Sequence, residues 1–428
     1  MAQAGIDVHV AQGEDGTIRV ASGPAVGRAD DGSGVAAAGP GFTGAVLDVA
    51  GAVLVWPVLG EPGLPVAEVH DVGRAQQWLW AVYGERTAAA VHACAARESA
   101  GVRVTADMTA LASGAARLGF GHWASRWWPA SYADGIPALE PDVLGLELAA
   151  LTHRCHQLFD DFGDQPDDCA AELIEEHQAA LDPLIQWWRT APQPADTARH
   201  LESVLRLIDN AADSAGLDGP VLRRLRSSLD QRRPAATSAG PGTLFARHDG
   251  YALAAGEPLL TGGRVIARGS GTNDWHRYPP GFVDASEHAV SWTARALGAR
   301  RRIEVEVVAH VAAPAGGASL VAEVRVNGGL PGRVVLARRD DMWTGRADLD
   351  LPLQAGAMPL RFEVGVLLPG FDPGPGPEGR EDRDAIRALV RRRLATAAQP
   401  PAHHASPHDA SSGLFLAEVA AAATGEDY

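Results

Sequence analysis

The sequence predicts a multi-domain α+β protein with a Trp-rich all-α helical domain, a C-terminal antiparallel β-sandwich and a small N-terminal β element. Two observations predict this fold class. Apolar residues recur every three or four positions across residues 71–233, as in amphipathic helices, and every second position across residues 244–371, as in strands. Seven of the eleven tryptophans lie between Trp78 and Trp188, inside the helical part. The 428 residues are enough for two or three domains.

The first 65 residues are expected to form the small β element. Ile6–Val10 alternates between apolar and polar side chains, Thr17–Ala21 follows a turn that contains glycine, and Val46–Val58 is rich in valine. Between these strands, residues 29–41 contain almost only Asp, Gly, Ala and similar small residues. We expect a Gly/Asp-rich loop there.

Residues 71–233 are expected to form an acidic domain of about six helices. Helices are expected over Arg74–Ala96, Thr105–Leu118 and Ala170–Trp188, and another opens at Pro141. The helix that opens at Pro141 carries one apolar stripe, made of Leu144, Leu148, Leu151, Cys155, Leu158 and Phe162. The face of the helix over 170–188 consists of Leu173, His177, Leu181, Leu184 and Trp188. Two later helices present Leu201, Val204, Leu205 and Ile208, and then Leu222, Leu225 and Leu229.

Residues 234–243 have the composition of a linker, and residues 244–371 are expected to form a β-sandwich of roughly seven strands. Within the sandwich, Asn327-Gly328 follows an alternating apolar run and is a strong hairpin signal. An Arg-rich helix is expected over residues 378–397. The final segment, residues 398–428, is expected to be a disordered tail because it begins with a run rich in Pro, His and Ser.

Composition excludes several function classes. The chain has no lysine, so its 37 basic residues are all arginine, and mechanisms that need a side-chain amine are closed to it. A net charge of -16 argues against general binding to nucleic acid or to an anionic membrane. The first twenty residues show no signal-peptide pattern, and the three cysteines form no CxxC motif. We therefore expect a cytoplasmic protein.

The most distinctive local sequence places three tryptophans and one arginine within six residues: Trp123, Arg126, Trp127 and Trp128. In one interpretation, Trp123 and Trp127 form a core face, and Arg126 stacks across it. In the other, the group is an interface anchor, because Trp and Arg are enriched at binding hot spots. The Arg-rich helix adds a second basic group, Arg391, Arg392 and Arg393. We expect a non-enzymatic scaffold or adaptor that engages another protein through these residues and uses no cofactor.

A metal-dependent enzyme is the alternative. The candidate ligands are His153, His156, Asp160, Asp161 and Asp164. His153, His156 and Asp160 have helical spacing, and the three aspartates match the DDxxD pattern of magnesium-diphosphate sites. No second metal motif follows, and the stripe through Cys155 turns His153 toward solvent. His177 lies on an apolar face, where we expect a hydrogen-bonded core histidine.

Two further features leave alternatives open. Trp275, Trp292 or Trp343 could bind carbohydrate on the sandwich, but the sequence does not distinguish such residues from core tryptophans. Residues 140–182 hold twelve acidic residues and one basic residue, whereas the helical region ends in a group of arginines. The acidic and basic segments either dock on each other or recruit a partner.

Overall fold

The structure is a computed structural model that places most of the chain. It describes residues 5–22, 41–60, 63–98, 101–159, 166–190, 195–231, 241–245, 263–311, 313–314, 319–349, 360–371, 379–398 and 413–424. These residues form helices and antiparallel sheets, with a β element near the N-terminus, so the mixed α and β class is confirmed. None of the helices described is long and apolar enough to cross a membrane.

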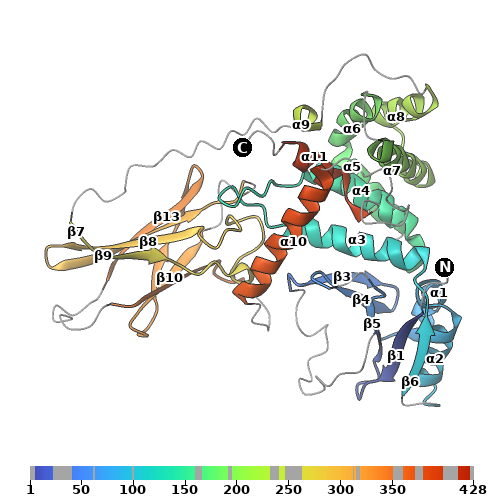
Figure 1. Cartoon of the computed structure of the whole chain (residues 1–428), viewed down its shortest axis with the longest axis horizontal. Helices are drawn as coiled ribbons and strands as arrows, with labels where there is room; N and C mark the ends of the chain where they lie inside the picture. Colours follow the sequence, from blue (N-terminus) through green and yellow to red (C-terminus); the bar gives the residue numbers. More distant parts are fainter. Residues whose placement is uncertain are drawn as a thin grey trace. The chain divides into compact units, whose positions relative to one another are not determined.

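The chain divides into two compact units (Figure 1). Unit 1 consists of Met1–Trp128, Leu139–Ala246 and Gly376–Asp427, and unit 2 consists mainly of Pro129–Ala138 and Arg247–Pro375. Each unit is therefore assembled from stretches that are distant in the sequence. The C-terminal helices belong to the same unit as the N-terminal sheet.

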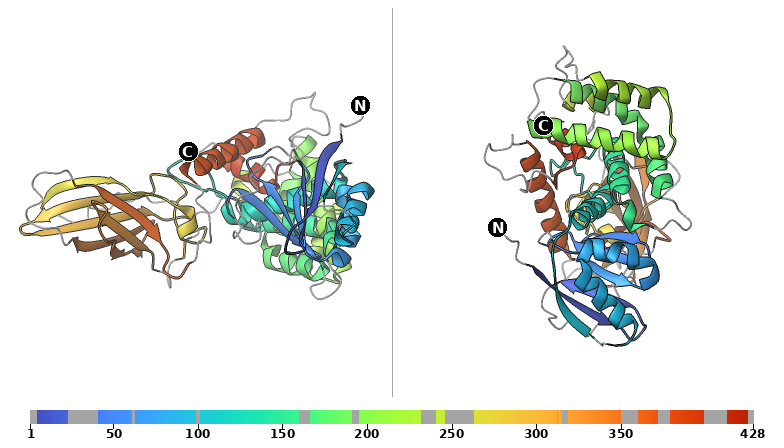
Figure 2. Two further views of the ribbon diagram at one scale, coloured as in Figure 1. Left: turned by 90° about the horizontal axis from the view of Figure 1, so that it is seen from below. Right: turned by 90° about the vertical axis from the view of Figure 1, so that its right-hand side faces the viewer.

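The sheet of unit 1 is antiparallel and six-stranded. Its strands are β1 (Ile6–Gln12), β2 (Ile18–Ser22), β3 (Gly44–Val49), β4 (Ala52–Pro57), β5 (Val66–Val69) and β6 (Gly101–Ala106), in the order β3-β4-β5-β2-β1-β6. The β element thus does not end at residue 65, because β5 and β6 complete the sheet. Two helices lie between these strands in sequence, α1 (Val72–Tyr83) and α2 (Glu85–Ala95), and α2 packs against β1 and β6 (Figure 2).

Local signals explain where these helices begin and end. Asp71 caps α1 by accepting a hydrogen bond from the backbone N–H of Arg74. The single helix expected over Arg74–Ala96 is instead two, because Gly84 has a φ of 83° and interrupts it. The helix expected from Thr105 begins later: residues 101–106 form β6, and Thr109 caps the helix that follows.

The remaining helices of unit 1 form an array with α4 at its centre. The elements are α3 (Ala110–Trp127), α4 (Pro141–Arg154), η1 (His156–Leu158), α5 (Pro166–His177), η2 (Gln178–Ala180), α6 (Leu181–Arg189), α7 (Ala195–Ser214), α8 (Pro220–Gln231), α9 (Pro241–Leu244), α10 (Arg380–Ala398) and α11 (Leu416–Thr424). Helices α3, α5, α7 and α11 all contact α4. Because neighbours surround it, α4 is buried at every position from Val143 to Thr152.

Two expected helices are broken in the structure. The stripe that starts at Leu144 remains buried as far as Leu158, but α4 ends at Arg154 and η1 continues the chain; Phe162 lies outside the described residues. The helix expected over Ala170–Trp188 consists of α5, η2 and α6. The break changes the helical register, so Trp187 is the buried tryptophan of α6 and Trp188 is only half-buried.

Unit 2 contains two antiparallel sheets. The five-stranded sheet has the order β12-β13-β9-β8-β7, formed by β7 (Arg264–Ser270), β8 (Val290–Leu297), β9 (Arg300–Val308), β12 (Ala337–Arg339) and β13 (Met342–Leu349). The three-stranded sheet has the order β11-β10-β14, formed by β10 (Val321–Val326), β11 (Gly332–Val335) and β14 (Phe362–Leu367). The hairpin signal is confirmed, because Asn327 and Gly328 have φ angles of 52° and 72° in the connection between β10 and β11.

A buried carboxylate fastens residues 129–138 to the rest of unit 2. Asp284 accepts hydrogen bonds from the Ser131 hydroxyl (2.7 Å), the Tyr132 N–H (2.7 Å) and the Ser286 N–H (2.9 Å). Burial raises the pKa of the Asp284 carboxyl, and these three donors act in the opposite direction. This one side chain therefore joins segments about 150 residues apart in the chain.

Candidate functional site

The C-terminal segment, Gly413–Thr424, packs against α4, α9 and α10 of unit 1, and the surface of unit 1 that it covers is called the groove. Its buried side chains are those of Leu414, Phe415, Leu416, Ala417, Glu418, Ala420 and Ala421. The expectation of a disordered tail over 398–428 is wrong for this segment, and residues 399–412 and 425–428 lie outside the described residues. The apolar triplet Leu414–Leu416 and the alanine-rich run after it explain the difference, because they provide a face to bury and favour a helix.

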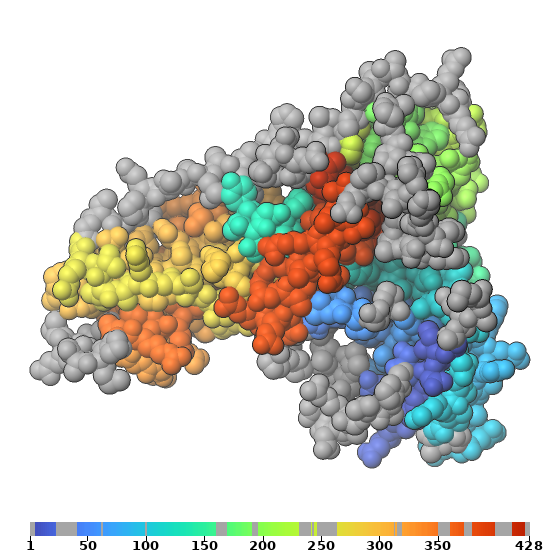
Figure 3. Space-filling view, viewed as in Figure 1, coloured from blue at the N-terminus to red at the C-terminus, as the bar shows by residue number. Residues whose placement is uncertain are grey.

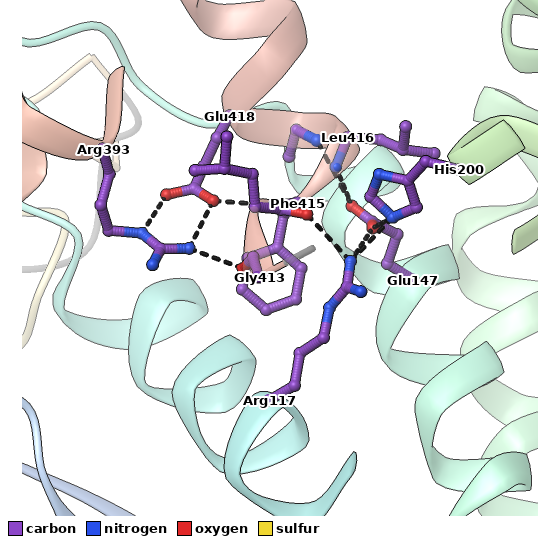
Figure 4. Close-up of polar contacts among 10 residues, drawn as sticks. Arg117, Glu147, His200, Arg393, Gly413, Phe415, Leu416 and Glu418 are labelled. Atoms are coloured by element: carbon purple, nitrogen blue, oxygen red, sulfur yellow. Dashed lines mark hydrogen bonds and ion pairs between the residues drawn. The ribbon is translucent and has the colours of Figure 1, made fainter. Parts of the chain in front are cut away.

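Glu147 of α4 caps the helix of the C-terminal segment (Figure 4). Its Oε2 atom accepts the N–H of Leu416 at 2.5 Å and the N–H of Ala417 at 3.4 Å. These are the first two N–H groups of α11, which have no partner inside the helix. Phe415, at the N-cap, has no side-chain oxygen to cap them. A carboxylate 269 residues away in the chain provides the missing acceptor.

Glu418 provides the second half of the cap. Its Oε2 atom accepts the N–H of Phe415 at 2.7 Å, the contact that the third helical residue makes in a capping box. Arg393 of α10 binds this carboxylate with two donors, Nε at 2.6 Å from Oε1 and Nη2 at 2.8 Å from Oε2. Arg393 Nη2 also donates to the carbonyl of Gly413 at 2.9 Å. Arg393 therefore recognises one acidic side chain and one backbone carbonyl of the segment.

Arg117 of α3 and His200 of α7 complete the polar network. Arg117 Nη2 donates to the carbonyl of Leu414 at 2.9 Å and to Glu147 Oε1 at 3.2 Å. It also lies 2.7 Å from His200 Nε2, and the same ring nitrogen is 3.2 Å from Glu147 Oε1. Glu147 is 1% exposed. Its burial is tolerated because Arg117 and two backbone donors contact it.

An aromatic row lies beneath the segment. The Phe415 ring is stacked 6.2 Å from the Phe120 ring, which in turn is 5.0 Å from the Trp123 ring. The Arg393 guanidinium is 4.4 Å from the centre of the Phe120 ring, and that of Arg117 is 5.2 Å from the centre of Phe415. Trp123 and Arg393, which the sequence placed in two separate interaction groups, thus meet through Phe120.

Glycine at position 121 allows this close approach. A Cβ atom there would lie 2.5 Å from Leu148 Cδ2 and 3.1 Å from Phe415 Cζ. The backbone of α3 can therefore approach α4 and the C-terminal segment together only where residue 121 has no side chain.

The other predicted interaction residues divide between core and surface. Trp123 is 3% exposed and donates its indole N–H to the carbonyl of Phe42 at 2.7 Å, and Trp127 is 8% exposed. Arg126 is exposed and stacks 5.4 Å from the Trp127 ring, and Trp128 is half-buried. Burial thus fits the core-face interpretation for Trp123 and Trp127 and leaves Arg126 and Trp128 accessible.

The arginines of α10 also divide. Arg391 and Arg392 are exposed, and the helix lies on the surface of unit 1 (Figure 3). Arg393, one residue further, turns inward to the C-terminal segment. One helix therefore carries both an outward basic face and an inward recognition residue.

The candidate metal ligands are not brought together in the part of the chain that the structure describes. His153 is half-buried and His156 exposed, with their rings 6.5 Å apart, and Asp160, Asp161 and Asp164 lie outside the described residues. No group of three or more metal-ligating side chains gathers among the described residues. Burial also raises the pKa of the nearby Cys155 thiol to about 12, so this thiol is protonated at neutral pH.

Other sequence-predicted residues have identifiable surroundings. His177 is hydrogen-bonded as expected, with Nδ1 3.0 Å from Asp142 Oδ1. Trp275, Trp292 and Trp343 are 5%, 7% and 1% exposed, so these rings face the interior of unit 2.

Among the described residues, Arg224 joins the basic segment of the helical region to the acidic one. Arg224 binds Asp182 with two donors, at 3.0 and 2.6 Å. This pair joins α8 to α6, so at least part of the basic group serves unit 1 itself.

Sequence reasoning missed Glu147, Arg117, His200 and Glu418. One signal was available for each glutamate: Glu147 interrupts an otherwise apolar helix, and Glu418 follows Phe415 at capping-box spacing. No family model, curated protein or solved structure matches this chain.

Proposed function

We propose that this chain is a non-enzymatic, cytoplasmic scaffold or adaptor that binds another protein through its helical region. The observation that supports the proposal most strongly is the site around Glu147 and Arg393. It recognises a short protein helix through backbone N–H groups, backbone carbonyls and one glutamate. Binding of a helix in a groove is a common mode of protein–protein recognition. In this proposal the two sheets of unit 2 pack as a sandwich, and the Trp-rich helices of unit 1 carry the interaction site.

In this proposal the partner contacts Arg126 and the half-buried Trp128 at the end of α3, and Arg391 and Arg392 on α10. Arg126 and Arg392 are exposed, and Trp and Arg are the side chains most enriched at binding hot spots. Trp123, Trp127 and Arg393 support this surface from beneath through the aromatic row and the core. Because the outer residues are cationic, the surface favours an acidic partner.

Affinity purification from the host cell tests the proposal. Full-length tagged protein is purified gently, and co-purifying proteins are quantified by mass spectrometry. We expect one partner at stoichiometric amounts, and at least about tenfold less of it with Arg126→Ala plus Arg392→Ala, since hot-spot residues each contribute about 2 kcal/mol.

The matched control is Arg206→Ala. Arg206 is also an exposed arginine of unit 1, paired with Glu202 at 2.8 Å, and lies on α7. It should leave both recovery and melting temperature unchanged. A protein that is purified without any stoichiometric partner would contradict the scaffold function.

A further inference from the structure

We propose that the groove that holds the C-terminal segment is a binding site for short helices of a partner protein that begin with an aromatic residue followed three positions later by glutamate. The chain's own C-terminal segment is then a tethered competitor for this site. This inference rests on the proposed function and specifies its partner class and its regulation.

Most polar contacts of the groove are with backbone groups of the bound segment. Glu147 binds backbone N–H groups, and Arg117 and Arg393 bind the backbone carbonyls of Leu414 and Gly413. Backbone groups are present in any peptide. Several apolar side chains of the segment are buried, and two of its side chains make directional contacts: Phe415 is stacked on Phe120, and Glu418 is bound by Arg393. An aromatic residue and a glutamate at this spacing therefore define the ligand class.

The occupant depends on the groove for its helix. The helix α11 has nine residues, fewer than an isolated helix needs to be stable in water. Its capping acceptor at Leu416 and Ala417 comes from α4 and not from its own N-cap residue. Folding of the segment is thus coupled to docking, as in other short recognition segments.

The covalent connection makes the internal segment a strong competitor. Fourteen residues, 399–412, link the end of α10 to Gly413. Return of the segment to the groove is therefore an intramolecular step, and an added ligand binds only the fraction of molecules whose groove is empty.

The polar contacts allow the C-terminal segment to be exchanged for a partner helix. Glu418 is fully buried against Arg393, and its transfer from water offsets much of what the ion pair contributes. When the segment leaves, both groups regain water, while Glu147 keeps its contact with Arg117. An incoming peptide with the same glutamate restores the Arg393 pair, whereas a peptide without it does not.

A peptide-binding assay on the full-length chain tests the inference. The probe is a fluorescent peptide with the sequence of Gly413–Thr424, and binding is measured by anisotropy. The chain carries Phe415→Ala and Glu418→Gln, which weaken the internal occupant and leave the groove intact. We expect the probe to bind this variant at least about tenfold more tightly than the wild-type chain, because a charge-assisted hydrogen bond is lost from the competitor. If Phe415→Ala impairs folding, Glu418→Gln alone is used.

Substitutions in the probe and in the groove test whether Arg393 recognises the glutamate of the peptide. A probe with Glu418→Gln should bind about tenfold more weakly, and Arg393→Ala in the groove should abolish the preference for glutamate. Arg206→Ala, an exposed arginine of α7 that pairs with Glu202, should leave probe binding unchanged.

Two results would overturn the inference. A folded variant that does not bind the probe would make the segment a permanent part of the core. A variant or wild-type chain that dimerises through the segment would assign the groove to a second copy of the chain. Since the assay needs no partner, normal probe binding without a co-purified partner contradicts only the proposed function, and a recovered partner without probe binding contradicts only this inference.

Discussion

A buried carboxylate is stable only where hydrogen-bond donors or cations surround it, and Glu147 is buried in this way. The side chain is 1% exposed, and its two oxygens are shared among Arg117, His200 and the first N–H groups of α11. No residue near Glu147 in sequence provides these contacts. At the residue scale, one glutamate therefore joins α3, α4, α7 and the C-terminal segment.

Replacing Glu147 tests this role. In Glu147→Ala, the N–H of Leu416 and the guanidinium of Arg117 lose their acceptor while still buried, so we expect a loss of about 3–5 kcal/mol in the free energy of unfolding of unit 1. Glu147→Gln keeps an acceptor and should cost less. Urea denaturation measures the free energy of unfolding of both variants. The control is Glu172→Ala, which replaces an exposed glutamate of α5 and should change this free energy by less than about 0.5 kcal/mol. Equal losses for Ala and Gln would contradict the capping role.

Among the elements, the surface helices could be predicted from the sequence and the central ones could not. Helices α7 and α8 bury the expected residues, including Leu201, Leu205 and Leu225, because one face meets the core and the opposite face meets water. In α4, neighbours on all sides remove the polar face, so the stripe does not show where the helix ends. For the C-terminal segment, the Pro- and His-rich run that precedes it predicts disorder, although the segment itself carries an apolar triplet and an alanine-rich run.

The same physical reason limits prediction of the candidate site. The sequence predicts Trp123 and Arg393 as interaction residues, since unusual aromatic and arginine groups are visible locally, and their role in binding a partner stays a prediction. Glu147 acts through partners that only the tertiary fold brings close, since Glu147 and Leu416 are 269 positions apart, and Arg393 reaches Glu418 from a different helix. Periodicity and motifs describe neighbours along a helix or strand, and contacts of this kind lie outside their range.

The approach of α3 to α4 gives a prediction at the element scale. In Gly121→Ala, a Cβ atom would lie 2.5 Å from Leu148 Cδ2. Overpacking costs about 1–3 kcal/mol, whereas alanine gains about 1 kcal/mol of helix propensity over glycine. Because Leu148 is buried, we expect the clash to dominate, with a net loss of about 1 kcal/mol in urea denaturation. Gly44→Ala, where the nearest atom to a Cβ is Val55 Cγ1 at an ordinary contact distance of 3.6 Å, should not destabilise the protein.

For the whole molecule, the division into two units predicts how the protein unfolds. Unit 1 and unit 2 have separate cores, and each is fastened by its own buried carboxylate, Glu147 in unit 1 and Asp284 in unit 2. Chains of this kind do not unfold as one two-state system. We expect two transitions in scanning calorimetry. Asp284→Ala should lower only the transition of unit 2, by about 2–4 kcal/mol, because the Ser131 and Tyr132 donors are left unpaired.

The double variant decides whether the units are independent. Glu147→Ala and Asp284→Ala lie in different units and share no hydrogen-bond partner among the described residues. Distant changes without shared partners add to within about 0.5 kcal/mol. Each transition of the double variant should therefore match that of the corresponding single variant. If Asp284→Ala also lowered the transition of unit 1, the two cores would unfold as one cooperative system. The C-terminal segment would then be held by the stability of the whole chain and not by the groove of unit 1 alone.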